Sequence, residues 1–146
     1  MNTEQLLKSL KEHKAVFLVI GATAFPVHGY ARATLDIDLF IRADRRNAQR
    51  IWDALRAFGY DVSDVTVDDL LTKKLLIRQY AVATDIHPFV AGVTFEQVWR
   101  HKVKAKFGQT YAWFASLHDL VRMKQAAGRP KDLEDLKYLR KLRPAR

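Results

Sequence analysis

Residues 21–41 read GATAFPVHGYARATLDIDLFI, and two carboxylates, Asp36 and Asp38, lie in the apolar end of this stretch. The alternation predicts a β-strand over 35–41 with the two aspartates together on one face. The expected apolar face consists of Leu35, Ile37, Leu39 and Ile41. Like charges on one face repel each other, and a hard divalent cation, Mg²⁺ or Mn²⁺, relieves that repulsion. The stretch therefore predicts a metal site on one strand.

The residues before the acid pair predict a strand, a glycine turn and a helix. The apolar run 15–20 is typical of a buried strand, Gly21 ends it, and residues 22–28 can begin a helix. Backbone N–H groups at a helix start face outward without partners and suit a phosphate group. A phosphate pocket and the acid pair would thus belong to one supersecondary unit.

Length and composition predict one globular domain over residues 1–146. The longest apolar runs are far shorter than the roughly 18 residues that a membrane span needs, and the first residues, MNTEQ, lack a basic and apolar leader. We therefore expect a cytoplasmic protein with no membrane partner. The chain has no cysteine, so a metal would need oxygen or imidazole ligands.

The charge balance predicts an anionic partner. Lysine and arginine number 25 against 16 acidic residues, which gives a formal net charge of +9. Such an excess attracts nucleotides and nucleic acids. The alternative interpretation is that the charge only aids solubility.

The remaining pattern predicts helices that alternate with short strands. Helices are expected over 3–14, over 44–58 with Gly59 as cap, over 94–99, from Ser116 to Gly128, and from Pro130 with a stripe of Leu133, Leu136, Leu139 and Leu142. Strands are expected over 74–79 and 81–90, with a hairpin of 103–107 and 111–114 around Gly108. Residues 60–71 fit a loop or a short helix. On the strand 81–90, Asp85 and His87 would share a face.

Three of these features resemble the nucleotidyltransferase signature of DNA polymerase β, kanamycin nucleotidyltransferase and the minimal nucleotidyltransferases. They are Gly21-Ala22, Asp36-Ile37-Asp38 and the later Asp85. Residues 28–34 and 124–136 are similar to a branch related to the AbiEii-type toxin enzymes. The resemblance spans about 16–142. It implies an α/β (α+β) fold, with a short mixed sheet flanked by helices over about 1–115 and a helical tail over about 116–146.

The resemblance also implies a chemistry. Asp36 and Asp38 would bind Mg²⁺ or Mn²⁺, and Asp85 would bind a second ion and accept the acceptor's proton. The implied nucleotide-binding residues are Gly21, Ala22, Arg32, Thr34, Lys124 and Lys131. The implied reaction moves a nucleoside monophosphate from a triphosphate such as ATP to a hydroxyl of RNA, for example tRNA, or of a protein. A toxin of this kind would have a cognate antitoxin.

Two other functions stay open. Ala22 stands where the family usually has glycine or serine, and alanine offers neither a hydroxyl nor unusual backbone angles. This departure favours an inactive binding or regulatory protein, such as an antitoxin. An antibiotic-modifying enzyme would want an acidic pocket, and the net charge of +9 argues against it.

Several side chains allow two interpretations. Arg32 could bind phosphate or pair with Asp36, and His87 could sit beside a metal or only cap a strand edge. The group Lys124, Arg129, Lys131 and Asp132 could bind a ligand or complement helix dipoles, although the dipole does not explain Lys131. The aromatic residues Trp99, Trp113 and Phe114 are expected in the core rather than as stacking platforms.

Overall fold

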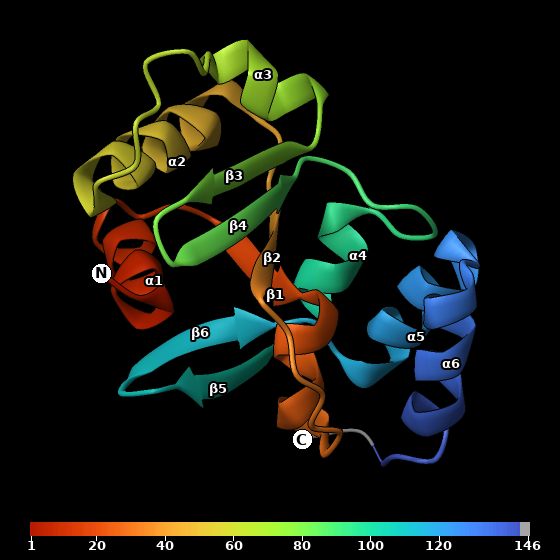
Figure 1. Ribbon diagram of the computed structural model, residues 1–146. Helices are drawn as coiled ribbons and strands as arrows, with labels where there is room; N and C mark the ends of the chain where they lie inside the picture. Colours follow the sequence, from red (N-terminus) through yellow and green to blue (C-terminus); the bar gives the residue numbers. More distant parts are fainter. Residues whose placement is uncertain (144–146) are drawn as a thin grey trace.

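A computed structural model describes residues 1–143, so the last three residues of the expected helical tail lie outside the described part. Within it, six strands form one mixed sheet in the order β3-β4-β2-β1-β6-β5 (Figure 1). The strands are β1 Phe17–Ile20, β2 Asp36–Ile41, β3 Leu75–Gln79, β4 Val82–His87, β5 Val103–Phe107 and β6 Thr110–Phe114. The predicted α/β fold with a mixed sheet and a helical C-terminal region is confirmed.

Six α-helices and one 3₁₀ helix surround the sheet in the described residues. They are α1 Thr3–Glu12, η1 Gly21–His28, α2 Arg45–Phe58, α3 Val67–Thr72, α4 Phe95–Arg100, α5 Leu117–Ala127 and α6 Pro130–Leu139. Figure 1 places α1 and α2 on one side of the sheet and α4, α5 and α6 on the other. None of the described helices is long and apolar enough to cross a membrane.

Local capping chemistry explains most helix boundaries. The side chain of Asp44 accepts from the backbone N–H of Asn47, and Gly59 ends α2 in the left-handed conformation. A capping box of Thr94 and Gln97 begins α4, in the segment where a helix was predicted. A second capping box begins at Thr66 and makes α3 a helix within the segment that the sequence left undecided.

Strand register decides which side chains share a face with the acid pair. Asp38 pairs with Ile20 on β1 and with Asp85 on β4, and paired residues point to the same side of a sheet. Val19 pairs with Phe114 on β6, so their neighbours Ile20 and Trp113 point to the other side. Asp38, Asp85 and Trp113 therefore belong to one face, which we call the acid face.

The opposite face holds the apolar core between the sheet and the helices α1 and α2. Ile37, Leu39 and Ile41 of β2 are buried there. On β6, Thr110 has the same orientation as Phe114, and its hydroxyl accepts a hydrogen bond from Lys11 of α1 at 3.3 Å. The burial of this face supplies the hydrophobic driving force that fixes the register of β2.

Two expected apolar positions are wrong. Leu35 lies just outside β2 and is 93% exposed, because the strand begins at Asp36. Leu133 on α6 is 52% exposed, whereas Leu136 and Leu139 are buried. Asp132 takes a buried place on α6 beside lysine and arginine partners, which leaves Leu133 on the solvent side.

Trp113 is a further correction. It was expected in the core, but 37% of it is exposed on the acid face. Phe114 is buried as expected, because the alternation along β6 turns it toward α1. Trp99 is partly buried and stacks on Phe95.

Candidate functional site

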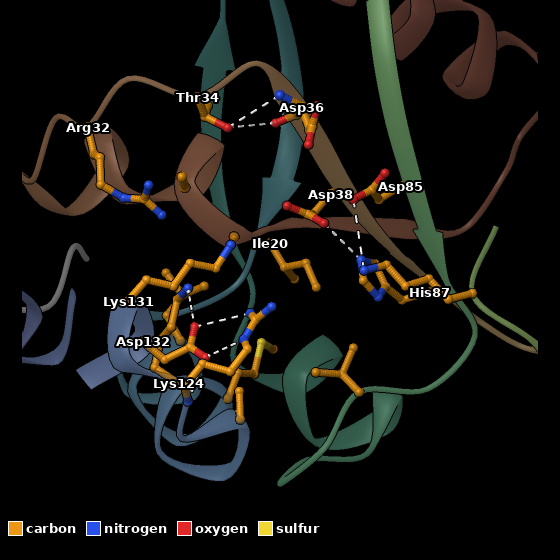
Figure 2. A pocket seen from close by; sticks show the side chains of 18 residues that line it. Ile20, Arg32, Thr34, Asp36, Asp38, Asp85, His87, Lys124, Lys131 and Asp132 are labelled. Carbon is orange, nitrogen blue, oxygen red and sulfur yellow. Dashed lines mark hydrogen bonds and ion pairs between the residues drawn. The ribbon is translucent and has the colours of Figure 1, made fainter. Parts of the chain in front are cut away.

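Three carboxylates meet at one end of the acid face, where β2 and β4 run parallel. Asp36 and Asp38 come from β2, and Asp85 lies beside Asp38 in the register of β4 (Figure 2). Their side chains are 39%, 25% and 9% exposed, respectively. The structure therefore brings together the three carboxylates that the sequence analysis named.

A histidine completes this group. His87 Nε2 lies 2.9 Å from Asp38 Oδ1, so the interpretation of His87 as a simple strand cap is wrong. Asp38, Asp85 and His87 each offer a ligand atom, and these atoms all lie within 4.8 Å of one another. One imidazole nitrogen and two carboxylate oxygens form a donor set that can hold a divalent metal ion. Asp36 is not part of this compact group.

Arg78 of β3 holds Asp36 and Asp85 instead. Its Nη1 donates to Asp85 Oδ1 at 2.6 Å, and its Nη2 lies 3.5 Å from Asp36 Oδ2. The bond to Asp85 raises the pKa of the Arg78 guanidinium above its ordinary value. The sequence analysis missed Arg78. Leu76 pairs with Asp85, and Arg78 lies two residues further along β3, so the alternation of side chains places Arg78 on the acid face.

The glycine turn lies directly against the acid pair. Gly21 has a φ of +68°, and a β-carbon at this position would lie 2.5 Å from Asp38 Oδ2. Only glycine combines this backbone angle with this close approach. Ala22, which follows it, is buried and lines the same cavity.

Arg32 and Thr34 have different partners from those considered in the sequence. Arg32 Nε lies 3.0 Å from Asp135 Oδ1 on α6, so of the two interpretations of Arg32 the pair with Asp36 is not formed. Thr34 Oγ1 donates to the main-chain oxygen of Asp36 at 3.1 Å and thereby holds the start of β2. Both residues still line the cavity.

The basic residues of α5 and α6 form a buried ionic network. Lys124 Nζ lies 2.9 Å from Asp132 Oδ1 and 3.2 Å from Asp135 Oδ2, and Arg129 Nε lies 2.7 Å from Asp132 Oδ2. Burial alone would raise the pKa of Asp132, but the bonds from Arg129 and Lys124 outweigh it and hold that pKa well below its ordinary value. Lys131 is exposed and lines the cavity with them.

These parts enclose one cavity of about 240 Å³. The carboxylates and His87 form one wall, and Lys124 and Lys131 form the facing wall (Figure 2). Arg129 also lines the cavity. Leu120 and Met123 of α5, with Val90, add an apolar patch. A cavity with a metal-ligating wall and a cationic wall suits a ligand that carries phosphates and a less polar group.

Comparison with known families agrees with this geometry. Residues 1–140 match a family described as nucleotidyltransferase of unknown function (DUF6036). The chain belongs to this family. The match covers the whole cavity and supports the nucleotidyltransferase resemblance, whereas the toxin branch stays a prediction. No curated protein and no solved structure matches the chain.

Proposed function

We propose that this protein transfers a nucleoside monophosphate from a nucleoside triphosphate to a hydroxyl acceptor. The observation that carries the proposal is the group of Asp38, Asp85 and His87, whose ligand atoms lie within 4.8 Å in a cavity faced by cationic side chains. The family match makes a nucleotide the expected substrate class.

The donor set fits a divalent metal ion. Asp38, Asp85 and His87 would hold it, and Asp36 would join them after its contact with Arg78 opens. A bound Mg²⁺ or Mn²⁺ supplies positive charge that neutralises the phosphate oxygens.

The facing wall would bind the triphosphate. Lys131 is free of ion pairs within the described residues and is the cation best placed to contact phosphate oxygens. Lys124 and Arg129 already share Asp132, so they fix the helix ends and add positive potential. The backbone of Gly21 and Ala22 approaches the same space, since both residues line the cavity.

The transfer itself would be an in-line displacement. The acceptor oxygen forms a bond to the α-phosphorus, the bond to the pyrophosphate oxygen breaks, and pyrophosphate leaves with those electrons. Asp85 is our candidate for the group that takes the acceptor's proton. It can do so once the hydrogen bond from Arg78 is released, because that bond occupies Oδ1.

Arg78 also supports a second candidate, a nucleotide-binding protein without turnover. The guanidinium links Asp85 and Asp36, the two carboxylates that turnover would require, and Ala22 offers no hydroxyl to phosphate. This alternative predicts nucleotide binding without release of pyrophosphate.

The deciding experiment measures thermal unfolding with each nucleoside triphosphate, with and without Mg²⁺. Ligand at ~100 times its Kd should add about 2.7 kcal/mol to the free energy of unfolding, or roughly 5–10 °C. Asp38→Asn should abolish the ligand-induced shift, whereas the control Asp64→Asn, an exposed carboxylate outside the cavity, should keep it. Ligand-induced shifts are compared because Asp38→Asn itself changes the repulsion in the free protein.

A shift with pyrophosphate release supports transfer, and a shift without release in the presence of RNA and protein acceptors supports the binding protein. The absence of a shift with every triphosphate would contradict both. The acceptor and the toxin role, with its cognate antitoxin, stay predictions from the resemblance.

A further inference from the structure

The hairpin of β5 and β6 carries an alternating set of lysine and aromatic side chains on the acid face. Lys104 pairs with Trp113 and Lys106 pairs with Tyr111, so these four side chains point to the same side. Tyr111 is 45% exposed and Trp113 is 37% exposed. We call this set the hairpin ladder.

The two lysines of the ladder and the neighbouring Lys102 contact rings rather than acids. Lys104 Nζ lies 5.1 Å from the ring centre of Tyr111, and Lys106 Nζ lies 5.4 Å from it. Lys102 Nζ lies 4.3 Å from the ring centre of Trp99 and 4.7 Å from that of Trp113. Across residues 1–143, none of these three lysines forms an ion pair.

A groove of about 430 Å³ runs beside the ladder. Lys11 and Lys14 line it together with Lys104, Tyr111 and Trp113. Lys11 and Lys14 therefore add two further positive charges to a lining that is otherwise largely apolar and aromatic. Lysines on an edge strand such as β5 also prevent edge-to-edge pairing of sheets, but that role does not require exposed rings.

We propose that the hairpin ladder and its groove bind single-stranded RNA. Exposed rings stack on unpaired bases, and cations placed beside them meet the phosphates that link those bases. A duplex would hide its bases from these rings, so the ladder fits an unpaired strand. The choice of RNA over DNA rests on the proposed function, in which RNA is one of the two acceptor classes.

The position of the ladder suits an acceptor strand. Trp113 and Asp38 lie on the same face of the sheet, and only β1 separates their strands, which places β6 roughly 10 Å from β2. An RNA held on the ladder could therefore direct its end toward the cavity.

The test is fluorescence anisotropy with a labelled single-stranded RNA of about 12 nucleotides, a length within the usual site size. The double variant Lys104→Gln/Lys106→Gln should weaken binding about tenfold or more. It should also reduce the slope of log K against log salt by about 1.4, since each phosphate contact to a single strand contributes about 0.7. The matched control Lys8→Gln/Arg46→Gln removes the same charge from exposed sites on α1 and α2 and should bind like wild type.

A second pair of variants separates stacking from a structural effect. Tyr111→Ala should weaken RNA binding about tenfold, and Tyr111→Phe should restore it because the ring stacks without its hydroxyl. Each of three results would overturn the proposal. They are an equal loss of RNA affinity in Lys8→Gln/Arg46→Gln, no RNA binding by the wild-type protein, and equal affinity for DNA of the same sequence. Binding to anionic phospholipid vesicles in place of RNA would overturn it as well.

The outcome is independent of the nucleotide site. The ladder variants should keep the triphosphate-induced thermal shift, and Asp38→Asn should keep RNA affinity. If the wild-type protein binds RNA but shows no triphosphate-induced thermal shift, the proposed transfer is refuted and the RNA surface stands. If it shows the shift but does not bind RNA, only the RNA surface is refuted.

Discussion

At the residue scale, the most constrained position is Gly21, where the chain turns against Asp38. Gly21→Ala would combine a left-handed backbone with a β-carbon 2.5 Å from Asp38 Oδ2. We expect it to lower the free energy of unfolding by about 2–4 kcal/mol, measured by urea denaturation. Gly128→Ala is the control, because it shares a similar φ of +64° but its nearest atom would lie 3.7 Å away. Equal losses in both variants would show that the contact with Asp38 does not matter.

His87 supports a second prediction at this scale. Its Nε2 contacts Asp38 Oδ1, so it either ligates a bound metal or orients the ligand that does. His87→Ala should weaken Mn²⁺ affinity by about 10–100-fold in isothermal titration calorimetry. His118→Ala, an exposed histidine of α5, should leave that affinity unchanged. Wild-type affinity in His87→Ala would exclude the imidazole from the metal site.

At the scale of elements, an ionic network joins the loop after η1 to α5 and α6 through Arg32, Asp135 and Lys124. Asp132 is fully buried and receives bonds from Lys124 and Arg129. Asp132→Asn would leave Arg129 without its anion and Lys124 with Asp135 alone, so we expect a loss of about 3 kcal/mol in the free energy of unfolding near pH 7. Asp64→Asn, an exposed carboxylate, should cost little.

The same pair of variants tests the pH dependence. The pKa of Asp132 is lower in the folded protein than in the unfolded chain. Its ionised form therefore stabilises the fold above the unfolded pKa of about 4, and this contribution is lost as pH falls from there through the folded pKa. In urea denaturation, the free energy of unfolding should fall less between pH 7 and pH 3 for Asp132→Asn than for the wild-type protein. An equal fall in both proteins would contradict the network.

Elements with local signals were predictable, and contacts between distant segments were not. Asp44 and Gly59 mark the ends of α2 in the sequence because capping depends on neighbours. Period two placed Asp36 and Asp38 on one face, whereas Asp85 was assigned to the site by the resemblance to the nucleotidyltransferases. The bond of Arg32 to Asp135, 103 residues away, depends on the packing of α6, which no local pattern specifies. Arg78 was missed because its contact with Asp36 depends on the order of three strands.

At the scale of the whole molecule, the two faces of the sheet differ in composition and burial. The face toward α1 and α2 is apolar and buried, whereas the acid face carries the carboxylates at one end and the hairpin ladder beyond β1. The chain carries a formal net charge of +9, which favours the approach of polyanions. Substitutions on the face toward α1 and α2 should therefore lower stability without affecting ligand binding, whereas substitutions at exposed positions of the acid face should affect binding with little loss of stability.

This division gives the last prediction. Leu39 is fully buried on the face toward α1 and α2, and Leu39→Ala should lower the free energy of unfolding by about 2–5 kcal/mol through a cavity in the core. Tyr111→Ala on the exposed ladder should lower it by about 1 kcal/mol or less. Urea denaturation measures both, and the triphosphate-induced thermal shift should survive in both. If Tyr111→Ala lowers the free energy of unfolding as much as Leu39→Ala does, the Tyr111 ring belongs to the core. A ring that packs in the core is not available to stack on a base, so the case for a stacking surface on the hairpin would fail.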